Sequence, residues 1–207
     1  MRLRHYFFIF TLLFSVFTFS AFAMSSPVTL VENVSSQMLS ELKADKVTLK
    51  NNPNKVFDIV DRILLPHADM TTMAKNVVGR DAWVSASAAD QQKFIREFTQ
   101  LLIRTYASAL ASYSDQTIKV YPIRGGWEGQ SQVEVQSEIL QSEGPAIPVS
   151  YRLLVEGQQW KLVDMSVDKV SIVENYRAQF ASDLSQGGLA NLDVKLAQHN
   201  ARLAEQG

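Results

Sequence analysis

Few residues in this 207-residue chain could carry acid–base chemistry, since it contains three histidines and no cysteine. His67 and Asp69 lie two positions apart, directly after Pro66. An imidazole beside a carboxylate could act as a general acid and base. An aspartate at the start of a helical pattern is, however, also a typical N-cap, and we favour that structural role.

A second candidate is Asp164, which lies between the apolar residues Val163 and Met165 in an expected strand. Its carboxylate could be a base in a buried pocket. Alternatively, it could bond a nearby loop or lie on the outer face of a sheet. We favour this second, structural interpretation.

Other signatures of chemistry are missing from the sequence. Neither His67 nor His199 has a second metal ligand at helical spacing. Gly125-Gly126 lacks the pattern of a dinucleotide or phosphate loop, and there is no G-x-S-x-G motif. We therefore expect no catalytic residue, no metal and no cofactor, and a protein that is not an enzyme.

The first residues have the layout of a secretory signal peptide. Arg2 and Arg4 precede an apolar run over residues 6–19, and Ala21 and Ala23 form a small-residue cleavage site. The alternative is an uncleaved membrane anchor, for which the run is short. We expect a cleaved signal peptide at 1–23 and a single domain at 24–207 in a bacterial periplasm. A domain of that length buries roughly 70% of its unfolded surface and needs no disulfides.

The balance of charge excludes some classes of partner. The formal net charge of the full chain is −1 at pH 7. A nucleic-acid-binding protein is expected to carry a basic surplus, and no basic stripe suggests direct adsorption to anionic lipid surfaces. We expect neither nucleic acid nor a membrane surface as a direct ligand.

The elements that would hold the candidate residues begin with helices. A stripe over residues 89–113 predicts a long amphipathic helix, and Ser87 with Asp90 predicts a capping box at its start. Shorter stripes predict helices around residues 31–42, 56–64, 70–77, 172–180 and 189–196. Their expected boundaries are an N-cap at Asn52 followed by Pro53, an N-cap at Asp69, a stop at Gly79 and a break at Gly187-Gly188.

From Thr117 onwards the apolar period changes from helical to two. Four strands are predicted, at residues 117–120, 133–139, 149–155 and 160–167. Turn-forming sequences separate them, which favours an antiparallel meander with one buried and one wet face. The predicted fold is therefore α+β, with a four-stranded antiparallel sheet and helices packed on one of its faces.

Several short motifs occur in a characteristic order along the chain. They are Leu64-Leu65-Pro66-His67, Asp69, Met73-Ala74, Gly79, Trp83, Gln92 with Phe94, Tyr106, Leu110, Tyr113, Val163-Asp164-Met165, Val170-Ser171-Ile172-Val173, Asn175-Tyr176-Arg177, Gln179-Phe180, and Gly188-Leu189 with Leu192 and Leu196. In this order, behind a signal peptide, the chain resembles the MlaC family of periplasmic phospholipid carriers, also called the toluene-tolerance auxiliary component. The resemblance covers essentially all of residues 24–207.

The resemblance implies a domain related to the NTF2-like cone, with lipid tails in an apolar cavity and the headgroup outside. It implies a soluble shuttle that moves phospholipid between the outer and inner membranes and maintains outer-membrane lipid asymmetry. The implied partners are an outer-membrane lipoprotein–porin complex and an inner-membrane ABC-transporter complex. Phospholipid would be cargo and not a cofactor, and we expect a monomer.

Combined with the strand alternation, the family fold predicts an acyl-chain cavity between the long helix, the strands and the C-terminal helix. Its expected lining is apolar: Phe98, Leu102, Tyr106, Leu110, Val135, Val149, Tyr151, Leu153, Val163, Met165, Val167, Ile172, Val173 and Tyr176. Two alternatives remain open. One is a small enzyme on the same sheet that uses Asp164, or His67 with Asp69, as acid or base. The other is a periplasmic interaction module with a solid core and no cavity.

Overall fold

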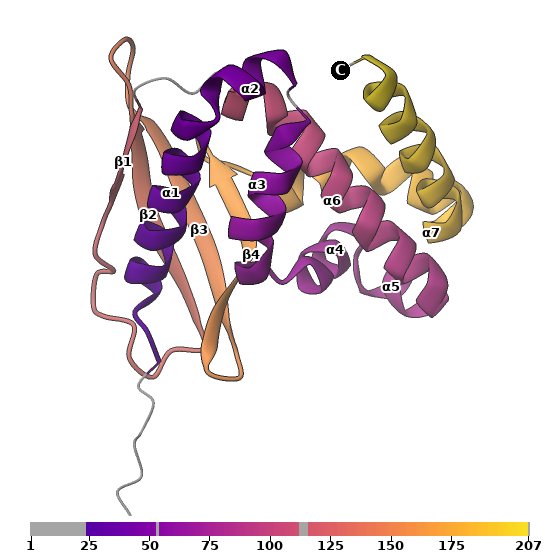
Figure 1. Cartoon of the computed structure of the whole chain (residues 1–207). Coiled ribbons are helices and arrows are strands. Elements are labelled where there is room, and N and C mark those ends of the chain that lie inside the picture. Colours follow the sequence, from indigo (N-terminus) through magenta and orange to yellow (C-terminus); the bar gives the residue numbers. More distant parts are fainter. Residues whose placement is uncertain (1–23, 53, 112–115, 207) are drawn as a thin grey trace, which may run out of the picture.

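The computed structural model describes residues 24–52, 54–111 and 116–206, so the predicted signal peptide lies outside the described residues. Helices come first, a sheet follows, and a long helical segment ends the described chain (Figure 1). This order confirms the predicted α+β class. None of the described helices combines the length and the apolar character needed to cross a membrane.

The first helices largely follow the predicted boundaries. They are α1 (Pro27–Ala44), α2 (Lys46–Asn51), α3 (Lys55–Ile63), the 3-10 turn η1 (Leu65–His67), α4 (Met70–Val78) and α5 (Arg80–Ser85). Asp69 caps α4, because its Oδ1 accepts a hydrogen bond of 2.9 Å from the backbone N–H of Thr72. Gly79 ends that helix at φ 82°, in the left-handed region that glycine adopts most easily.

The predicted N-cap at Asn52 is wrong. The helix α3 begins at Lys55, with Asn54 at the N-cap position, and Pro53 lies outside the described residues. The Oδ1 of Asn52 instead accepts a bond of 3.2 Å from the N–H of Asn54. Asparagine thus makes a local turn ahead of the helix, which sequence spacing alone does not distinguish from a cap.

The long helix α6 spans Ala88–Ala111, close to the predicted range. Ser87 and Asp90 form the expected capping pair: the Asp90 N–H donates to Ser87 Oγ at 3.1 Å, and that hydroxyl donates to Asp90 Oδ2 at 2.7 Å. The last described segment, α7 (Ile172–Gln206), is interrupted at Gly188, whose φ of 64° and ψ of −166° confirm the predicted break.

The sheet has five antiparallel strands in sequence order: β1 (Thr117–Val120), β2 (Gln132–Leu140), β3 (Ile147–Glu156), β4 (Gln159–Val167) and β5 (Val170–Ser171). The prediction of four strands is therefore corrected to five. The missed strand β5 has two residues, paired with Ser166 and Val167 of β4. Two residues are too few to show a period, so the sequence carried no signal for it.

The helices divide into two groups around this sheet. The helices α1 and α3 lie over one face, whereas α4, α5, α6 and α7 gather beside β4 (Figure 1). α1 contacts β1 and β2, and α4 and α7 contact β4. The expectation of helices on one face is thus met by the first group only, because the second group extends past the edge of the sheet. The NTF2-like cone stays a prediction.

Candidate functional site

The face of the sheet beneath α1, here called the inner face, is apolar along its length. Residues that lie opposite each other in neighbouring strands share one face. One row across the strands joins Val120, Ser137, Val149 and Val167. On one side of it lies the row Ile118, Ile139 and Ile147. On the other side lies the row Val135, Tyr151 and Met165, and beyond it the row Val133, Leu153 and Leu162. The opposite, outer face carries polar residues such as Glu134 and Arg152.

Two hydrophobic clusters pack inside the molecule. The first joins α4, α6 and α7 to the end of the sheet that carries Val133, Leu153 and Trp160. The second joins α1, α2, α3 and the end of α6 through residues such as Leu42 and Ile103. Leu64 packs against both clusters. A small domain usually has one contiguous core with minor satellites, so this division is a feature to explain.

Between the clusters lies a stretch of the inner face that we call the seam. It consists of Ile118, Ser137, Ile139, Ile147, Val149 and Val167. Among the described residues, neither cluster includes any of the six. Ser137 and Val149 are nonetheless 2% and 4% exposed. The seam is therefore a mainly apolar part of the inner face outside both clusters, buried at Ser137 and Val149 and partly exposed at its other four residues.

The predicted lining residues of the strands share the inner face, with one exception. Val135, Tyr151, Leu153 and Met165 pack in or against the first cluster, whereas Val149 and Val167 belong to the seam. The exception is Val163. It is the extra residue of a β-bulge, because Arg152 pairs with Asp164 and Leu153 with Leu162.

The predicted lining residues of the helices gather mainly at the α6–α7 contact. The Phe98 and Tyr176 rings meet edge to face with centroids 5.3 Å apart. Ile172 and Val173 are buried in the same first cluster, and Leu102 and Tyr106 pack against it while partly exposed. Burial and the nearby Tyr176 raise the pKa of the Tyr106 phenol. Leu110 instead packs against the second cluster.

The expectation that the long helix faces the strands is wrong for most of its stripe. The helix α6 packs mainly against α7, α3 and α4. The aromatic rings of α6 and α7 pack against one another, mostly edge to face; they are Phe94, Phe98, Tyr176 and Phe180. An amphipathic stripe shows which face is buried but not which partner buries it, and here the partner is a helix.

Ser137 was missed as a site residue. Its Oγ donates a long bond of 3.4 Å to the backbone carbonyl of Val149, and it sits in the middle of the seam. Its position two residues after Val135 and two before Ile139 was the available signal, because period two assigns it to the buried face. Its polar type concealed that assignment. A serine between valines leaves more room than a third branched side chain would.

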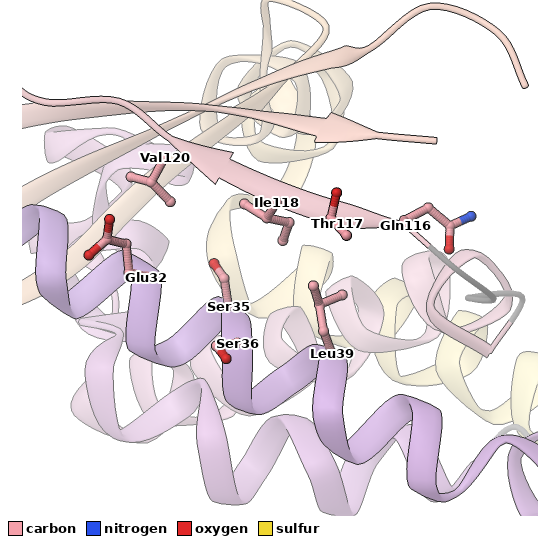
Figure 2. A pocket seen from close by; sticks show the side chains of 8 residues that line it. All are labelled: Glu32, Ser35, Ser36, Leu39, Gln116, Thr117, Ile118 and Val120. Carbon is pink, nitrogen blue, oxygen red and sulfur yellow. The ribbon is translucent and has the colours of Figure 1, made fainter. Parts of the chain in front are cut away.

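A groove opens onto the inner face between α1 and β1 (Figure 2). Its volume is about 370 Å³, near the lower end of ligand pockets, which run from about 300 to 1,000 Å³. Glu32, Ser35 and Leu39 line it from α1, and Thr117, Ile118 and Val120 line it from β1. The groove is therefore lined mainly by apolar side chains from β1 and by a mixture of polar and apolar side chains from α1.

Comparison with known proteins decides the family. The model of the MlaC protein family matches residues 32–198 of this chain. The chain belongs to the MlaC family. It is similar to the toluene tolerance protein ttg2D of Pseudomonas putida, at 28% identity over 176 residues that cover 85% of this chain and 81% of that protein.

Two further relatives of this MlaC-family chain match over most of their length. One is the intermembrane phospholipid transport system binding protein MlaC of Haemophilus influenzae, 28% identical over 202 residues, or 95% of this chain and 94% of the relative. The other is a solved structure of the phospholipid-binding protein from Ralstonia solanacearum in complex with a phospholipid. Its TM-score is 0.81 at 31% identity, and the match covers 87% of this chain and 99% of that one.

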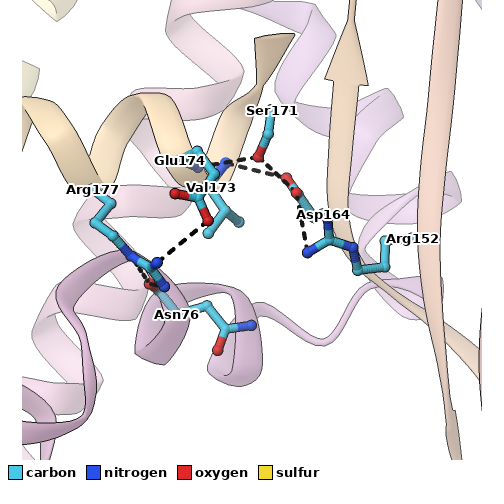
Figure 3. A network of polar contacts seen from close by, with 7 residues as sticks. All are labelled: Asn76, Arg152, Asp164, Ser171, Val173, Glu174 and Arg177. Carbon is cyan, nitrogen blue, oxygen red and sulfur yellow. Dashed lines mark hydrogen bonds and ion pairs between the residues drawn. The ribbon is translucent and has the colours of Figure 1, made fainter. Parts of the chain in front are cut away.

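In this MlaC-family chain, Asp164 lies on the outer face of β4 and joins the sheet to α7 (Figure 3). Its Oδ1 accepts a bond of 3.1 Å from the N–H of Val173, and its Oδ2 accepts one of 2.7 Å from Ser171 Oγ. The Nη1 of Arg152 lies 3.8 Å from the same Oδ2. The interpretation of Asp164 as a hydrogen-bond partner of a nearby connection on the outer face is confirmed.

The pair His67 and Asp69 also has a structural setting. The Oδ1 of Asp69 caps α4, and its N–H donates to the carbonyl of Leu162 at 2.9 Å. Burial, with a further contribution from Lys161, lowers the pKa of His67. Within the described residues, no group of three His, Asp or Glu side chains is placed to hold a metal ion.

Proposed function

We propose that this MlaC-family protein binds phospholipid acyl chains over the seam and carries the lipid between the outer and inner membranes. In this role it would help to maintain the lipid asymmetry of the outer membrane. The observation that carries the proposal is the seam itself, a mainly apolar part of the inner face that belongs to neither cluster. The phospholipid complex of the Ralstonia solanacearum neighbour supports it.

The free energy of transfer explains why such a carrier needs interior apolar surface. Each methylene contributes about 0.8 kcal/mol when it leaves water. Two acyl chains of about sixteen carbons would therefore cost on the order of 20 kcal/mol to expose. Side chains such as Val149 and Val167 can remove those methylenes from water. The charged headgroup can stay hydrated outside.

The wider setting follows from the family and the predicted signal peptide. We place the protein in the periplasm as a monomeric carrier for which phospholipid is cargo and no cofactor is needed. The partners are an outer-membrane lipoprotein–porin complex and an inner-membrane ABC-transporter complex. Each partner would load or unload the carrier by favouring one state of the cavity over the other.

The two other functions considered for this chain gain less support. The carboxylates of Asp164 and Asp69 accept hydrogen bonds from backbone N–H groups at the starts of helices. This arrangement gives no support to a role in acid–base catalysis. A solid-core interaction module would be expected to pack its inner face continuously, whereas the seam divides the two clusters. We therefore retain the carrier as the proposed function.

The proposal is tested by filling the seam. Ser137→Leu adds a branched side chain between Val120 and Val149, so it should reduce the phospholipid extracted per protein several-fold. Ser150→Leu is the matched control, because Ser150 lies on the outer face between Gln136 and Ser166. Lipid is measured by organic extraction and mass spectrometry of protein purified without detergent.

Overpacking a core costs about 1–3 kcal/mol, so thermal unfolding of both variants is recorded alongside. If Ser137→Leu does not fold, Ser137→Val makes the same test with a smaller side chain. Equal phospholipid in folded Ser137 and Ser150 variants would contradict the proposal that the seam holds the acyl chains.

A further inference from the structure

The helix α1 has few fully buried residues, and its middle turns lie between the second cluster and the groove. Of its eighteen residues, Pro27, Val31 and Leu42 are buried. Val31 belongs to the first cluster and Leu42 to the second. Across the intervening turns, Val34 and Met38 are partly buried, while Ser36 is exposed. The middle of α1 therefore packs against the second cluster through Val34 and Met38, while Glu32, Ser35 and Leu39 line the groove.

The groove lies beside the middle of α1 (Figure 2). Glu32, Ser35 and Leu39 line it from successive turns of α1, and β1 forms the opposite wall. As the first strand in the sheet order, β1 has β2 as its only neighbouring strand in the described part of the chain. The groove thus opens at an edge of the sheet, where a ligand can approach from solvent.

The β1 side of the groove continues directly into the seam. Ile118 pairs with Ile139, and Val120 pairs with Ser137. Ser137 in turn pairs with Val149, which pairs with Val167. A row of inner-face side chains that is apolar except for Ser137 therefore runs from the groove across four strands. Glu32 and Ser35 supply polar groups to the groove from α1.

We propose that a phospholipid acyl chain enters the protein sideways through the groove between α1 and β1, and that α1 moves away from the sheet to admit it. This inference rests on the proposed function and specifies its entrance. The chemistry of the groove matches an acylglycerol: the side chains of Ile118 and Val120 on β1 suit methylenes, while the hydroxyls of Ser35 and Ser36 on α1 can donate hydrogen bonds to the glycerol esters.

Because the chain has no cysteine, a single introduced thiol reports on this entrance alone. Ser35→Cys places the thiol in the groove, and Asn33→Cys places it on the exposed side of α1. A maleimide with a bulky aromatic group should label the Ser35 variant several-fold more slowly when phospholipid is bound than after delipidation. The Asn33 variant should react at the same rate in both states.

The second arm measures loading. Each variant is delipidated, labelled, and incubated with vesicles of phosphatidylethanolamine and phosphatidylglycerol. The adduct of the Ser35 variant should take up several-fold less lipid than the adduct of the Asn33 variant. Ile118→Cys, whose side chain lines the groove from the inner face of β1, should behave as Ser35→Cys does, which covers the case of a misfolded Ser35 adduct.

The outcomes separate the entrance from the function. If unlabelled protein takes up phospholipid and the groove adducts load as well as the Asn33 adduct, the acyl chain enters elsewhere and the inference is overturned. If unlabelled protein takes up no phospholipid at all, the proposed function fails and the inference fails with it.

Discussion

The carboxylate of Asp164 links the sheet to the C-terminal helix. Its side chain is 3% exposed although it belongs to the polar outer face. Its two oxygens accept from the N–H of Val173 and the hydroxyl of Ser171, and that hydroxyl also accepts from the N–H of Glu174 at 3.1 Å. Two otherwise unpaired amides at the start of α7 are thereby satisfied.

Asp164→Asn should therefore destabilise the protein and leave its cargo in place. The amide replaces an ionised acceptor and brings donor hydrogens toward groups that already donate. Hydrogen bonds to charged groups contribute about 1.5–3 kcal/mol, so we expect the free energy of unfolding in urea to fall by about 1–3 kcal/mol. Phospholipid extracted per folded protein should not change.

The control for this prediction is Asp61→Asn at an exposed position of α3, which should alter stability by less than about 0.5 kcal/mol. Equal losses in the two variants would refute the capping role of Asp164. Loss of bound lipid from a fully stable Asp164→Asn protein would place the carboxylate in the binding site instead.

At this scale the sequence predicted caps better than it predicted the site. Asp69, Ser87 and Asp90 were correctly assigned because capping depends on a few neighbouring backbone amides. Ser137 was not identified, because its role depends on β1 and β3, which lie beside it only in the folded sheet. Contacts between near neighbours in sequence can be predicted from the sequence, whereas contacts between separate strands cannot.

The packing of α7 against α6 includes a buried carboxylate. Asp193 is fully buried, and neither of its carboxylate oxygens has a hydrogen-bond partner. Burial raises its pKa to about 6; the charged groups that act on it are Lys93 and Arg96, which lower the pKa, and Asp90 and Glu97, which raise it. Asn200, two turns further along, is better satisfied, since its Nδ2 donates to the carbonyl and Oε2 of Glu97 at 2.9 Å.

We predict that Asp193 makes the stability of the protein depend on pH. Its pKa is about 6 when folded and 3.8 when unperturbed, so the folded state holds the proton more tightly. The resulting stabilisation is fully present below about pH 4 and is lost as the pH rises through about 6. The difference of about two pKa units corresponds to about 3 kcal/mol.

Asp193→Asn cannot ionise, so the stability of this variant relative to the parent should rise by about 3 kcal/mol between pH 4 and pH 7. Urea unfolding of the variant and the parent at several pH values measures this difference. The other carboxylates are common to both proteins, so their contributions to the free energy of unfolding cancel. Glu205→Gln, at an exposed position of the same helix, should show no such trend. A difference for Asp193→Asn that is flat with pH would contradict the prediction.

Among the elements, the sequence predicted those with long periodic patterns. The helices α1, α4 and α6 and the strands β1 to β4 each show several turns or alternations. The helices α2 and α5 were missed because six residues make fewer than two helical turns, and β5 was missed because two residues show no alternation. The partner of α6 was also wrongly assigned: two amphipathic helices far apart in sequence can bury each other as readily as either can bury a sheet.

The whole molecule combines a sheet covered by α1 and α3 with a helical group beside β4 (Figure 1). The class and the one-sided burial of the sheet followed from the change of period at Thr117. The division of the interior into two clusters could not be predicted, because it depends on how the two helical groups are placed around the sheet. That division leaves the seam on which the proposed function rests.

The most direct test of this account is the lipid content of the protein itself. The full chain, including its predicted signal peptide, is expressed in a Gram-negative host, purified from the periplasm without detergent, and extracted with organic solvent. Mass spectrometry of the extract should detect phospholipid in an amount comparable with the protein. Folded protein from which no phospholipid can be extracted would contradict the claim that the interior holds acyl chains.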